Sequence, residues 1–248
     1  ILIDLAADFR LSKHDEYKKW YKINHKAKNL IKKSIYALPE IKGKLIKKYS
    51  IMSCPGCYPT SILLPLIPLI KNNLIYNKNI IMDSKSGYSG AGRGVHKKYK
   101  NKNLYESISA YGLASHRHNA EIQQELDLNT GKKNYFQFTP HLTPMFRGIL
   151  TTIYVDLKYK VTQSKIISTL KKKYKNHPFV KIVKPDVFLS TNDVINTNNC
   201  LISVCKSKYK DKIIILSAID NLIKGGGGQA VQNMNIFYGF RENEGLND

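Results

Sequence analysis

Short apolar runs alternate with polar and glycine-rich stretches along the whole chain. Apolar or alternating runs of about 4–8 residues are typical of strands, and longer ones are typical of buried helices. No run approaches the roughly 18 apolar residues that a membrane span requires. We therefore expect strands at residues 1–5, 49–52, 79–83, 134–138, 149–158, 179–183, 200–206 and 212–218.

Helical patterns occupy several of the segments between these runs. Residues 60–70 are apolar enough for a buried helix, and residues 164–175 have the pattern of a surface helix. We also expect a short basic helix over 41–49 and a polar helix that ends near Leu128, with Ser115 as its N-cap. Strands joined by such long returns indicate an α+β sheet with one helix-covered face.

The overall composition is that of a globular protein, with 42% hydrophobic and 10% aromatic residues among 248. This length accommodates one large domain or two ordinary ones. Four cysteines in a chain of this length, without a signal peptide, do not suggest a secreted disulfide framework. We therefore expect a cytoplasmic protein without a membrane partner.

The formal net charge of +22 suggests nucleic-acid binding, because basic surfaces attract phosphate. Only 5 of the 40 basic residues are arginine, however, and the 35 lysines accompany 29 isoleucines and 21 asparagines. All three abundant types have AT-rich codons, so base composition explains the charge, and we expect no nucleic-acid partner. A salt-dependent affinity for DNA would restore that alternative.

Arginine should then persist mainly where its planar, bidentate side chain is needed. The five arginines are therefore candidate site residues. For Arg10 and Arg241, a surface position is as well supported as a position in the site. The set is Arg10, Arg93, Arg117, Arg147 and Arg241.

The stretch from Ser53 to Thr60 is the strongest candidate for chemistry. An extended run reaches the Pro55-Gly56 turn, and the apolar helix follows, so Cys57 is expected in the first turn of that helix. Free backbone amides and the positive end of the helix dipole favour a thiolate there, which predicts a lowered thiol pKa and a nucleophilic sulfur.

Cys54 and Cys57 also form a Cys-x-x-Cys pattern, which in isolation signals a redox pair or part of a metal site. Zinc is not favoured, because no second close pair of ligands follows and the histidines lie far away in the sequence. We expect no metal. Oxidation to a disulfide between Cys54 and Cys57, which would switch off a nucleophile, stays a secondary hypothesis.

A second candidate cluster combines His116, Arg117, His118 and Glu121. It offers a proton carrier, an anion-binding group and a carboxylate that can orient an imidazole. His118 and Glu121 share one helix face because they are three residues apart.

Two glycine-rich segments complete the set of motifs. Residues 84–94 contain four glycines and three serines, which allow a close approach of the backbone to a ligand, although their spacing is neither a Walker loop nor a GxGxxG fingerprint. Residues 225–228 are all glycine and lead into a helix. Its polar face predicts contact with a ligand and consists of Gln229, Gln232, Asn233 and Asn235.

Taken together, these motifs resemble the N-acetyl-gamma-glutamyl-phosphate reductases in the same order from end to end. The segments that carry the resemblance are Ile3–Arg10, Cys54–Thr60, Ser86–Arg93, His116–His118, Thr139–Met145 and Lys224–Met234. Cys54 departs from the pattern, because the family usually has a non-thiol residue there. The glycine-rich NADP fingerprint of the family is absent, so the chain resembles the family without roughly its first third.

The resemblance implies an α/β fold of the glyceraldehyde-3-phosphate dehydrogenase-like kind. Residues 1–56 would form the C-terminal part of a Rossmann-type NADP-binding domain, 57–217 an inserted α+β catalytic and dimerisation domain, and 218–248 a return segment with a helix that packs on the first domain. It also implies a homo-oligomer. Because the chain begins at Ile1 and lacks the fingerprint, we expect it to be a fragment, which puts independent NADP(H) binding in question.

The activity implied is NADPH-dependent reduction of N-acetyl-glutamyl 5-phosphate to the 5-semialdehyde, a step of arginine biosynthesis with a small-molecule substrate. Cys57 would attack the acyl phosphate and form a thioester, with His118 as acid and base and Glu121 orienting it. Arg93, Arg117 and His116 would bind substrate anions. Cofactor contacts are expected from Ser86, Gly87, Ser89, Gly90, Gly226 and Asn233.

Three alternatives stay open at this point. An aspartate-semialdehyde dehydrogenase shares the cysteine and the chemistry on a shorter acyl phosphate, although His116–His118 and Thr139–Met145 favour the glutamyl enzyme. A nucleic-acid-binding protein is disfavoured by composition alone. A truncated, inactive remnant is the third.

Overall fold

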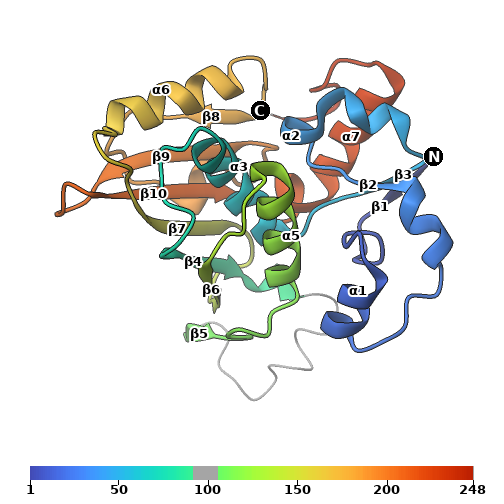
Figure 1. The fold of residues 1–248 in the computed structure, drawn as a ribbon. Helices are drawn as coiled ribbons and strands as arrows, with labels where there is room; N and C mark the ends of the chain where they lie inside the picture. Colours follow the sequence, from blue (N-terminus) through green and yellow to red (C-terminus); the bar gives the residue numbers. More distant parts are fainter. Residues whose placement is uncertain (92–105, 248) are drawn as a thin grey trace.

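A computed structural model describes residues 1–91 and 106–247 (Figure 1). The first part of the chain forms a three-stranded parallel sheet in the order β1-β3-β2, from Leu2–Asp4, Ile51–Ser53 and Ser34–Tyr36. Helix α1 (His14–Tyr21) and the 3₁₀ helix η1 (Lys28–Lys33) connect β1 to β2. Helix α2 (Pro39–Lys42) and the 3₁₀ helix η2 (Gly43–Lys48) connect β2 to β3.

The rest of the chain is built on a seven-stranded mixed sheet in the order β5-β6-β4-β7-β10-β9-β8. Its β4–β6 and β8–β9 pairs are parallel and the other pairs are antiparallel. In sequence order the strands are β4 (Ile80–Gly87), β5 (Ser109–Ala110), β6 (Phe136–Thr143), β7 (Ile149–Asp156), β8 (Val180–Ile182), β9 (Cys200–Lys206) and β10 (Lys212–Ile219).

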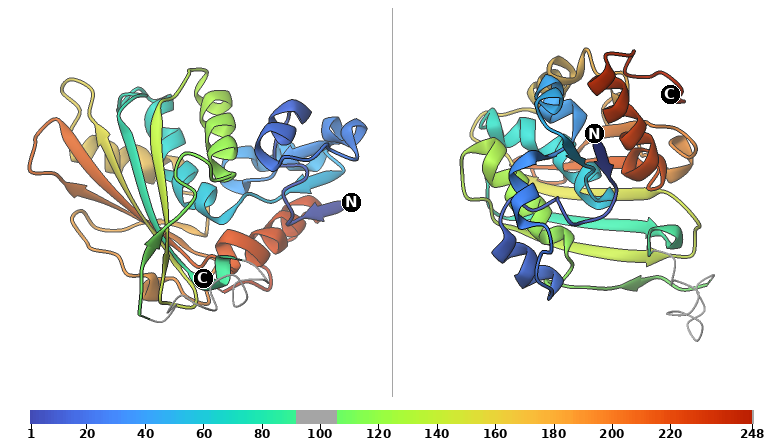
Figure 2. Two further views of the ribbon diagram at one scale, coloured as in Figure 1. Left: turned by 90° about the horizontal axis from the view of Figure 1, so that it is seen from below. Right: turned by 90° about the vertical axis from the view of Figure 1, so that its right-hand side faces the viewer.

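Helices α3 (Cys57–Lys71), α5 (His118–Thr130) and α6 (Gln163–Tyr174) cover one face of this sheet (Figures 1 and 2). Strand residues of alternate parity, such as Ile153 and Ile215, pack with the helices in one hydrophobic core. Residues of the other parity, such as Ile81 and Tyr154, are exposed on the opposite face. The sequence prediction of one helix-covered face is therefore confirmed.

Helix α3 is buried along its length and fixes the position of Cys57 at its first residue. Pro65 and Pro68 lie inside this helix, where a proline removes one backbone hydrogen bond. The missing amide of Pro68 leaves the Leu64 carbonyl without its helical partner, and the Tyr174 hydroxyl of α6 donates to that carbonyl at 2.5 Å. A side chain of a neighbouring helix thus replaces the lost bond and lets α3 continue.

The last helix, α7 (Gly228–Tyr238), returns to the small sheet. Its Ile236 and Phe237 pack against Ile35, Ile46 and Met52. A π-helical turn, η5 (Ile223–Gly227), joins β10 to α7. This packing agrees with the predicted return helix, while the boundaries of the three predicted domains stay a prediction.

Several predicted boundaries were wrong. The strands expected at 79–83 and 134–138 continue to Gly87 and Thr143, because β4 and β6 pair in parallel over their full lengths. The basic segment 41–49 forms the short α2 and a 3₁₀ helix rather than one amphipathic helix. Ser115 does not cap α5, whose N-cap is Arg117 without a side-chain cap. Lys97–Asn103, predicted to be a charged surface segment, lie outside the described residues.

Two shorter 3₁₀ helices, η3 (Tyr88–Ala91) and η4 (Thr191–Asp193), complete the described elements. No helix within residues 1–91 and 106–247 has the length and apolar character needed to cross a membrane.

Candidate active site

Cys57 is the first residue of α3, as predicted, and Gly56 is the N-cap. The backbone of η5 covers it closely, because a Cβ on Gly225 would lie 2.6 Å from Cys57 Cβ. All four cysteines are free, and Cys57 alone is partly exposed while the other three are buried. It is therefore the one thiol of this chain that a substrate can reach directly.

The predicted lowering of the thiol pKa was wrong. Burial raises the pKa of Cys57 from 9.0 to about 11. The Arg10 guanidinium and the backbone amides of Tyr58 and Cys57 lower it, as the helix-start argument expected, but by less than burial raises it. The thiol is consequently neutral at pH 7 and must lose its proton as it reacts.

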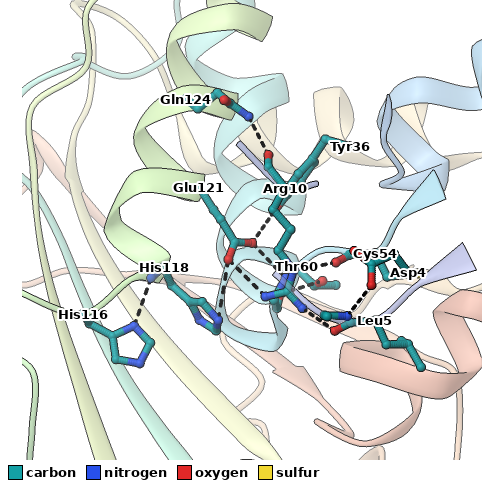
Figure 3. Close-up of polar contacts among 12 residues, drawn as sticks. Asp4, Leu5, Arg10, Tyr36, Cys54, Thr60, His116, His118, Glu121 and Gln124 are labelled. Carbon is teal, nitrogen blue, oxygen red and sulfur yellow. Dashed lines mark hydrogen bonds and ion pairs between the residues drawn. The ribbon is translucent and has the colours of Figure 1, made fainter. Parts of the chain in front are cut away.

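Glu121 is a fully buried carboxylate beside the turn that leads to Cys57 (Figure 3). It accepts hydrogen bonds from the Gly56 amide at 2.9 Å and from the Tyr36 hydroxyl at 3.1 Å. Arg10 Nη1 donates to it at 3.1 Å. His118 Nε2 lies 3.8 Å from Glu121 Oε1, which is longer than a hydrogen bond, so orientation of His118 by Glu121 stays a prediction.

The His118 ring lies against the backbone immediately before Cys57. A Cβ placed on Gly56 would be 2.3 Å from His118 Nε2, so this close approach requires glycine. Burial, together with the positive charges of Arg10 and Arg117, lowers the pKa of His118 well below 6.5. His118 is therefore a neutral imidazole at pH 7, able to accept a proton.

Arg10 is part of this site and not a surface residue. Its side chain is only 11% exposed, and beyond Glu121 it donates to the Cys54 carbonyl at 2.8 Å and the Leu5 carbonyl at 2.9 Å. Arg241, the other arginine for which either position was open, lies on the surface and pairs with Glu244. The scarcity of arginine thus correctly indicated a site position for Arg10 but not for Arg241.

The substrate-binding predictions concern residues that lie around this centre. His116 Nδ1 accepts a hydrogen bond from the His118 amide at 3.1 Å, and its ring packs edge-on against Tyr58 and Tyr111. Arg117 is exposed and its guanidinium lies 5.1 Å from the centre of the Tyr21 ring. Arg93 lies outside the described residues. Binding of substrate by the three residues stays a prediction.

The segment after β4 is folded closely against its neighbours. Ser86 and Gly87 end the strand, and a Cβ on Gly87 would lie 2.5 Å from the Phe146 carbonyl oxygen. Ser89 Oγ accepts a hydrogen bond from Asn221 Nδ2 at 3.0 Å. Gly90 is exposed. Asn221 lies two residues before the η5 turn, which packs against Cys57. The hydrogen bond between Ser89 and Asn221 therefore links the two glycine-rich segments.

Arg147, another of the five arginines, and His141, in the Thr139–Met145 segment, make protein contacts. Arg147 Nη1 lies 3.3 Å from the buried carboxylate of Asp220. His141 Nδ1 lies 3.1 Å from Asp83 Oδ1, on the sheet face opposite the helices.

The polar face of α7 is buried, and its contact with a ligand stays a prediction. Gln229, Gln232, Asn233 and Asn235 are buried and bond to protein groups. Helix α7 contacts α2, η2 and β1, and its buried polar side chains meet polar groups of the protein.

Gly226 and Asn233, the remaining predicted cofactor contacts, differ in access. Gly226 is partly exposed. Asn233 Nδ2 donates to the Ala37 carbonyl at 2.9 Å and lies 3.8 Å from Cys54 Sγ. Its Oδ1 is buried and has no partner among the described residues. Cofactor contact by either residue stays a prediction.

Comparisons with known proteins decide the family. A family model described as "Semialdehyde dehydrogenase, dimerisation domain" matches residues 57–221. The N-acetyl-gamma-glutamyl-phosphate reductase of Desulforamulus reducens is 45% identical over 99% of this chain and 71% of its own length. The enzyme of the same name from Clostridium botulinum (strain Alaska E43) is 47% identical over 100% of this chain and 72% of its own length. The probable chloroplastic enzyme of Arabidopsis thaliana is 47% identical over 99% of this chain and 61% of its own length.

This chain belongs to the N-acetyl-gamma-glutamyl-phosphate reductase family.

Solved structures support the fold of this family member. An aspartate semialdehyde dehydrogenase from Francisella tularensis has a TM-score of 0.69 at 15% identity, covering 95% of this chain and 74% of that one. Aspartate semialdehyde dehydrogenase II from Vibrio cholerae has a TM-score of 0.66 at 16% identity, covering 91% of this chain and 77% of that one. The predicted fold class is confirmed.

One part of the site in this reductase-family chain, Tyr36, was not predicted from the sequence. Tyr36 bonds to Glu121 from 85 residues away, and no local pattern marks it. Arg10 was a candidate only because arginine is rare and because it ends the Ile3–Arg10 motif. Among the described residues, no three histidine, cysteine, aspartate or glutamate side chains cluster as a metal site would require.

Proposed function

We propose that this chain catalyses NADPH-dependent reductive dephosphorylation of N-acetyl-glutamyl 5-phosphate to the 5-semialdehyde, in arginine biosynthesis. The observation that carries the proposal is the position of Cys57, the one partly exposed thiol, at the start of α3 beside His118 and the Glu121 carboxylate. The family and its 43–47% identical relatives support the same reaction.

Cys57 is the proposed nucleophile. Its sulfur forms a bond to the acyl carbon, the bond from that carbon to the phosphate oxygen breaks, and phosphate leaves with the bonding electrons. Acyl phosphates suit this attack because phosphate is a good leaving group. The product of this step is a thioester on Cys57.

His118 is the proposed acid and base. Because burial holds the thiol pKa at about 11 and the imidazole pKa well below 6.5, the resting pair is neutral thiol and neutral imidazole. The thiol proton therefore has to move as the sulfur attacks, and the Glu121 carboxylate, 3.8 Å from Nε2, stabilises the imidazolium that forms. Arg10 in turn holds Glu121 in place through its hydrogen bond.

NADPH, when bound, supplies the hydride that reduces the thioester to the aldehyde level. Ser89, Gly90 and Gly226 fit a cofactor contact because they are accessible. Ser89 bonds to Asn221, and Gly226 belongs to the η5 turn that packs against Cys57. The unpartnered Oδ1 of Asn233 would accept a hydrogen bond from an amide. Ser86 and Gly87 would act by shaping the loop, since both are buried.

Arg117, with Arg93 and His116, is the proposed anion-binding group for the substrate carboxylate or phosphate. Arg117 immediately precedes His118 and is exposed, which leaves its guanidinium able to form bidentate contacts. The aspartate-semialdehyde alternative is less well supported, because the structures of that name are only 13–16% identical to this chain.

We further propose a homo-oligomer assembled through the open face of the seven-stranded sheet, where Ile81 is 47% and Tyr154 44% exposed. The description of the matching family model as a dimerisation domain supports this. The proposed location is the cytoplasm, and one relative is described as chloroplastic. The proposed domain limits are 1–56, 57–217 and 218–248.

The direct experiment is phosphate-dependent reduction of NADP with N-acetyl-glutamate 5-semialdehyde, measured on this chain and on a version extended upstream. Cys57→Ala should abolish the reaction and Cys54→Ala should retain it. Full activity in Cys57→Ala would contradict the proposal.

A further inference from the structure

Lys224 and Glu40 form a buried ion pair next to the Gly225 backbone, which packs against Cys57. Lys224 and Glu40 are both 0% exposed, and the Lys224 ammonium lies 2.5 Å from Glu40 Oε1. The same ammonium donates to Gln232 Oε1 at 2.7 Å, and Gln232 Nε2 donates to Glu40 Oε1 at 3.0 Å. Taking two charges out of water is costly, and apolar residues of similar size often replace such a pair without loss of stability. A role in stability alone therefore explains the pair poorly.

One residue separates this pair from the reactive cysteine. Lys224 precedes Gly225, where an added Cβ would lie 2.6 Å from Cys57 Cβ and 3.2 Å from its Cα. Both belong to the turn η5, in which Gly226 has non-helical backbone angles. Whatever fixes Lys224 therefore also fixes the backbone that packs against the Cβ and Cα of Cys57.

A second buried residue, Asp220, holds the start of the η5 turn. Asp220 is fully buried, and its Oδ1 accepts hydrogen bonds from the amides of Leu222 and Ile223 at 2.8 and 3.2 Å. Its backbone carbonyl accepts from the Gly225 amide at 2.9 Å. The turn is thus held by a carboxylate at its start and by the Lys224 ammonium at its centre.

Glu40 connects this anchor to the other side of the site. It follows Tyr36, whose hydroxyl bonds to Glu121, by four residues. Its carbonyl also accepts a hydrogen bond from Lys173 Nζ at 2.7 Å, and Gln232 bonds to Glu242 as well as to Glu40. One short segment, Tyr36–Glu40, therefore contacts both the cover of Cys57 and the carboxylate next to His118.

We propose that Lys224, through its ion pair with Glu40, is a positioning residue that holds the Gly225 backbone against Cys57 and keeps the thiol shielded from water. The inference rests on the proposed role of Cys57 as the nucleophile. It assigns to a buried lysine, which touches no substrate, control over the solvation of the attacking sulfur.

The test is site-resolved alkylation of Cys57 by iodoacetamide, mapped by mass spectrometry, in Lys224→Met, Glu40→Gln and the double variant. Burial is the main cause of the raised thiol pKa, so loosening of Gly225 should lower it. A fall of about one unit would increase the thiolate fraction, and the labelling rate at neutral pH, about tenfold. Each single variant should show this rise, and the double variant should show no further rise, because both changes release the same contact.

A matched control is Lys42→Met. Lys42 lies on α2, as Glu40 does, and pairs with the buried Glu125 of α5 at 3.0 Å, so its loss removes a similar ion pair from the same helical turn. Fully buried Cys200 reports general unfolding and should stay unlabelled in every variant. If Lys224→Met does not fold, Glu40→Gln, which keeps the side-chain shape, provides the test.

An unchanged Cys57 labelling rate in a folded Glu40→Gln or Lys224→Met protein would overturn the inference, as would an equal rise in Lys42→Met or additive rises in the double variant. Failure of the proposed function would show differently, as activity that survives in Cys57→Ala. The labelling experiment needs neither substrate nor NADPH, so the two failures are distinguishable.

Discussion

The Glu121 carboxylate accepts a hydrogen bond from the backbone amide of Gly56, the residue immediately before Cys57, at 2.9 Å. The same carboxylate lies 3.8 Å from His118 Nε2. A single buried charge therefore fixes the turn that presents the nucleophile and also faces its acid and base. This shared carboxylate therefore contacts both the turn before the sulfur and the imidazole.

Replacing Glu121 should disturb both functions at once. Glu121→Gln keeps the size of the side chain but leaves Arg10 without its counter-charge, and an amide cannot accept from all the donors that surround it. We expect kcat to fall about 100-fold, as for loss of general acid–base assistance. We also expect unfolding to become easier by about 3 kcal/mol. Steady-state kinetics and urea titration measure the two effects, and unchanged kcat would argue against this role of the carboxylate.

Gly56→Ala tests the close contact between His118 and the turn. The backbone angles of Gly56, φ −63° and ψ 154°, suit alanine, so only the approach of the new Cβ to His118 Nε2, 2.3 Å, opposes the change. The imidazole must move, and we expect a loss in kcat of about 100-fold. Gly227→Ala is the control, because its nearest neighbour is 3.6 Å away, and it should leave kcat unchanged. Equal activities of the two variants would show that His118 need not lie there.

Arg10→Met removes the cation that lowers the pKa values of both Cys57 and His118. The alkylation rate of Cys57 at neutral pH should therefore fall, because the thiol pKa rises further above about 11. Stability should drop by about 3–5 kcal/mol, since Glu121 is left buried and unpaired. Arg241→Met is the matched control, because that arginine is 82% exposed and its pair with Glu244 should be worth less than about 1 kcal/mol. A larger loss in the control than in Arg10→Met would refute the assignment.

His118 should make the protein sensitive to acid. Its pKa is held well below 6.5 in the folded chain, whereas the unfolded chain binds a proton near 6.5, so stability is retained above that pH and lost as the pH falls toward the folded value. The free energy of unfolding should therefore decrease by about 1.4 kcal/mol for each pH unit below about 6.5. His118→Asn should lack this component. Urea titrations of both proteins at several pH values measure the difference, and parallel curves would mean that His118 is not buried neutral.

Local patterns predicted those parts of the fold that depend on neighbours in sequence. The apolar run at 60–70 is the buried core of α3, and the Pro55-Gly56 turn correctly placed Cys57 at its start. The spacing of His118 and Glu121 likewise predicted their proximity, because residues three apart share a helix face. Strand ends were less well predicted, because Gly87 and Thr143 become strand only through pairing with each other.

The rest of the site depends on contacts between distant residues. Arg10 reaches Glu121 across 111 positions and Tyr36 across 85, and nothing in the flanking sequence indicates either contact. A polar helix face such as Gln232 and Asn233 looks the same whether it meets a ligand or buried protein groups. The thiol pKa was mispredicted for a related reason, since the cover supplied by Gly225 comes from residues far along the chain.

Transfer of the acyl group to Cys57 can be measured by mass spectrometry of the intact and the digested protein. The chain is mixed with N-acetyl-glutamyl 5-phosphate without NADPH, quenched in acid and digested, with Cys57→Ala and Cys54→Ala in parallel. We expect one N-acetylglutamyl group on Cys57 in the parent chain and in Cys54→Ala, and none in Cys57→Ala. An equal adduct in Cys57→Ala, or an adduct of the parent chain on another residue, would contradict this expectation.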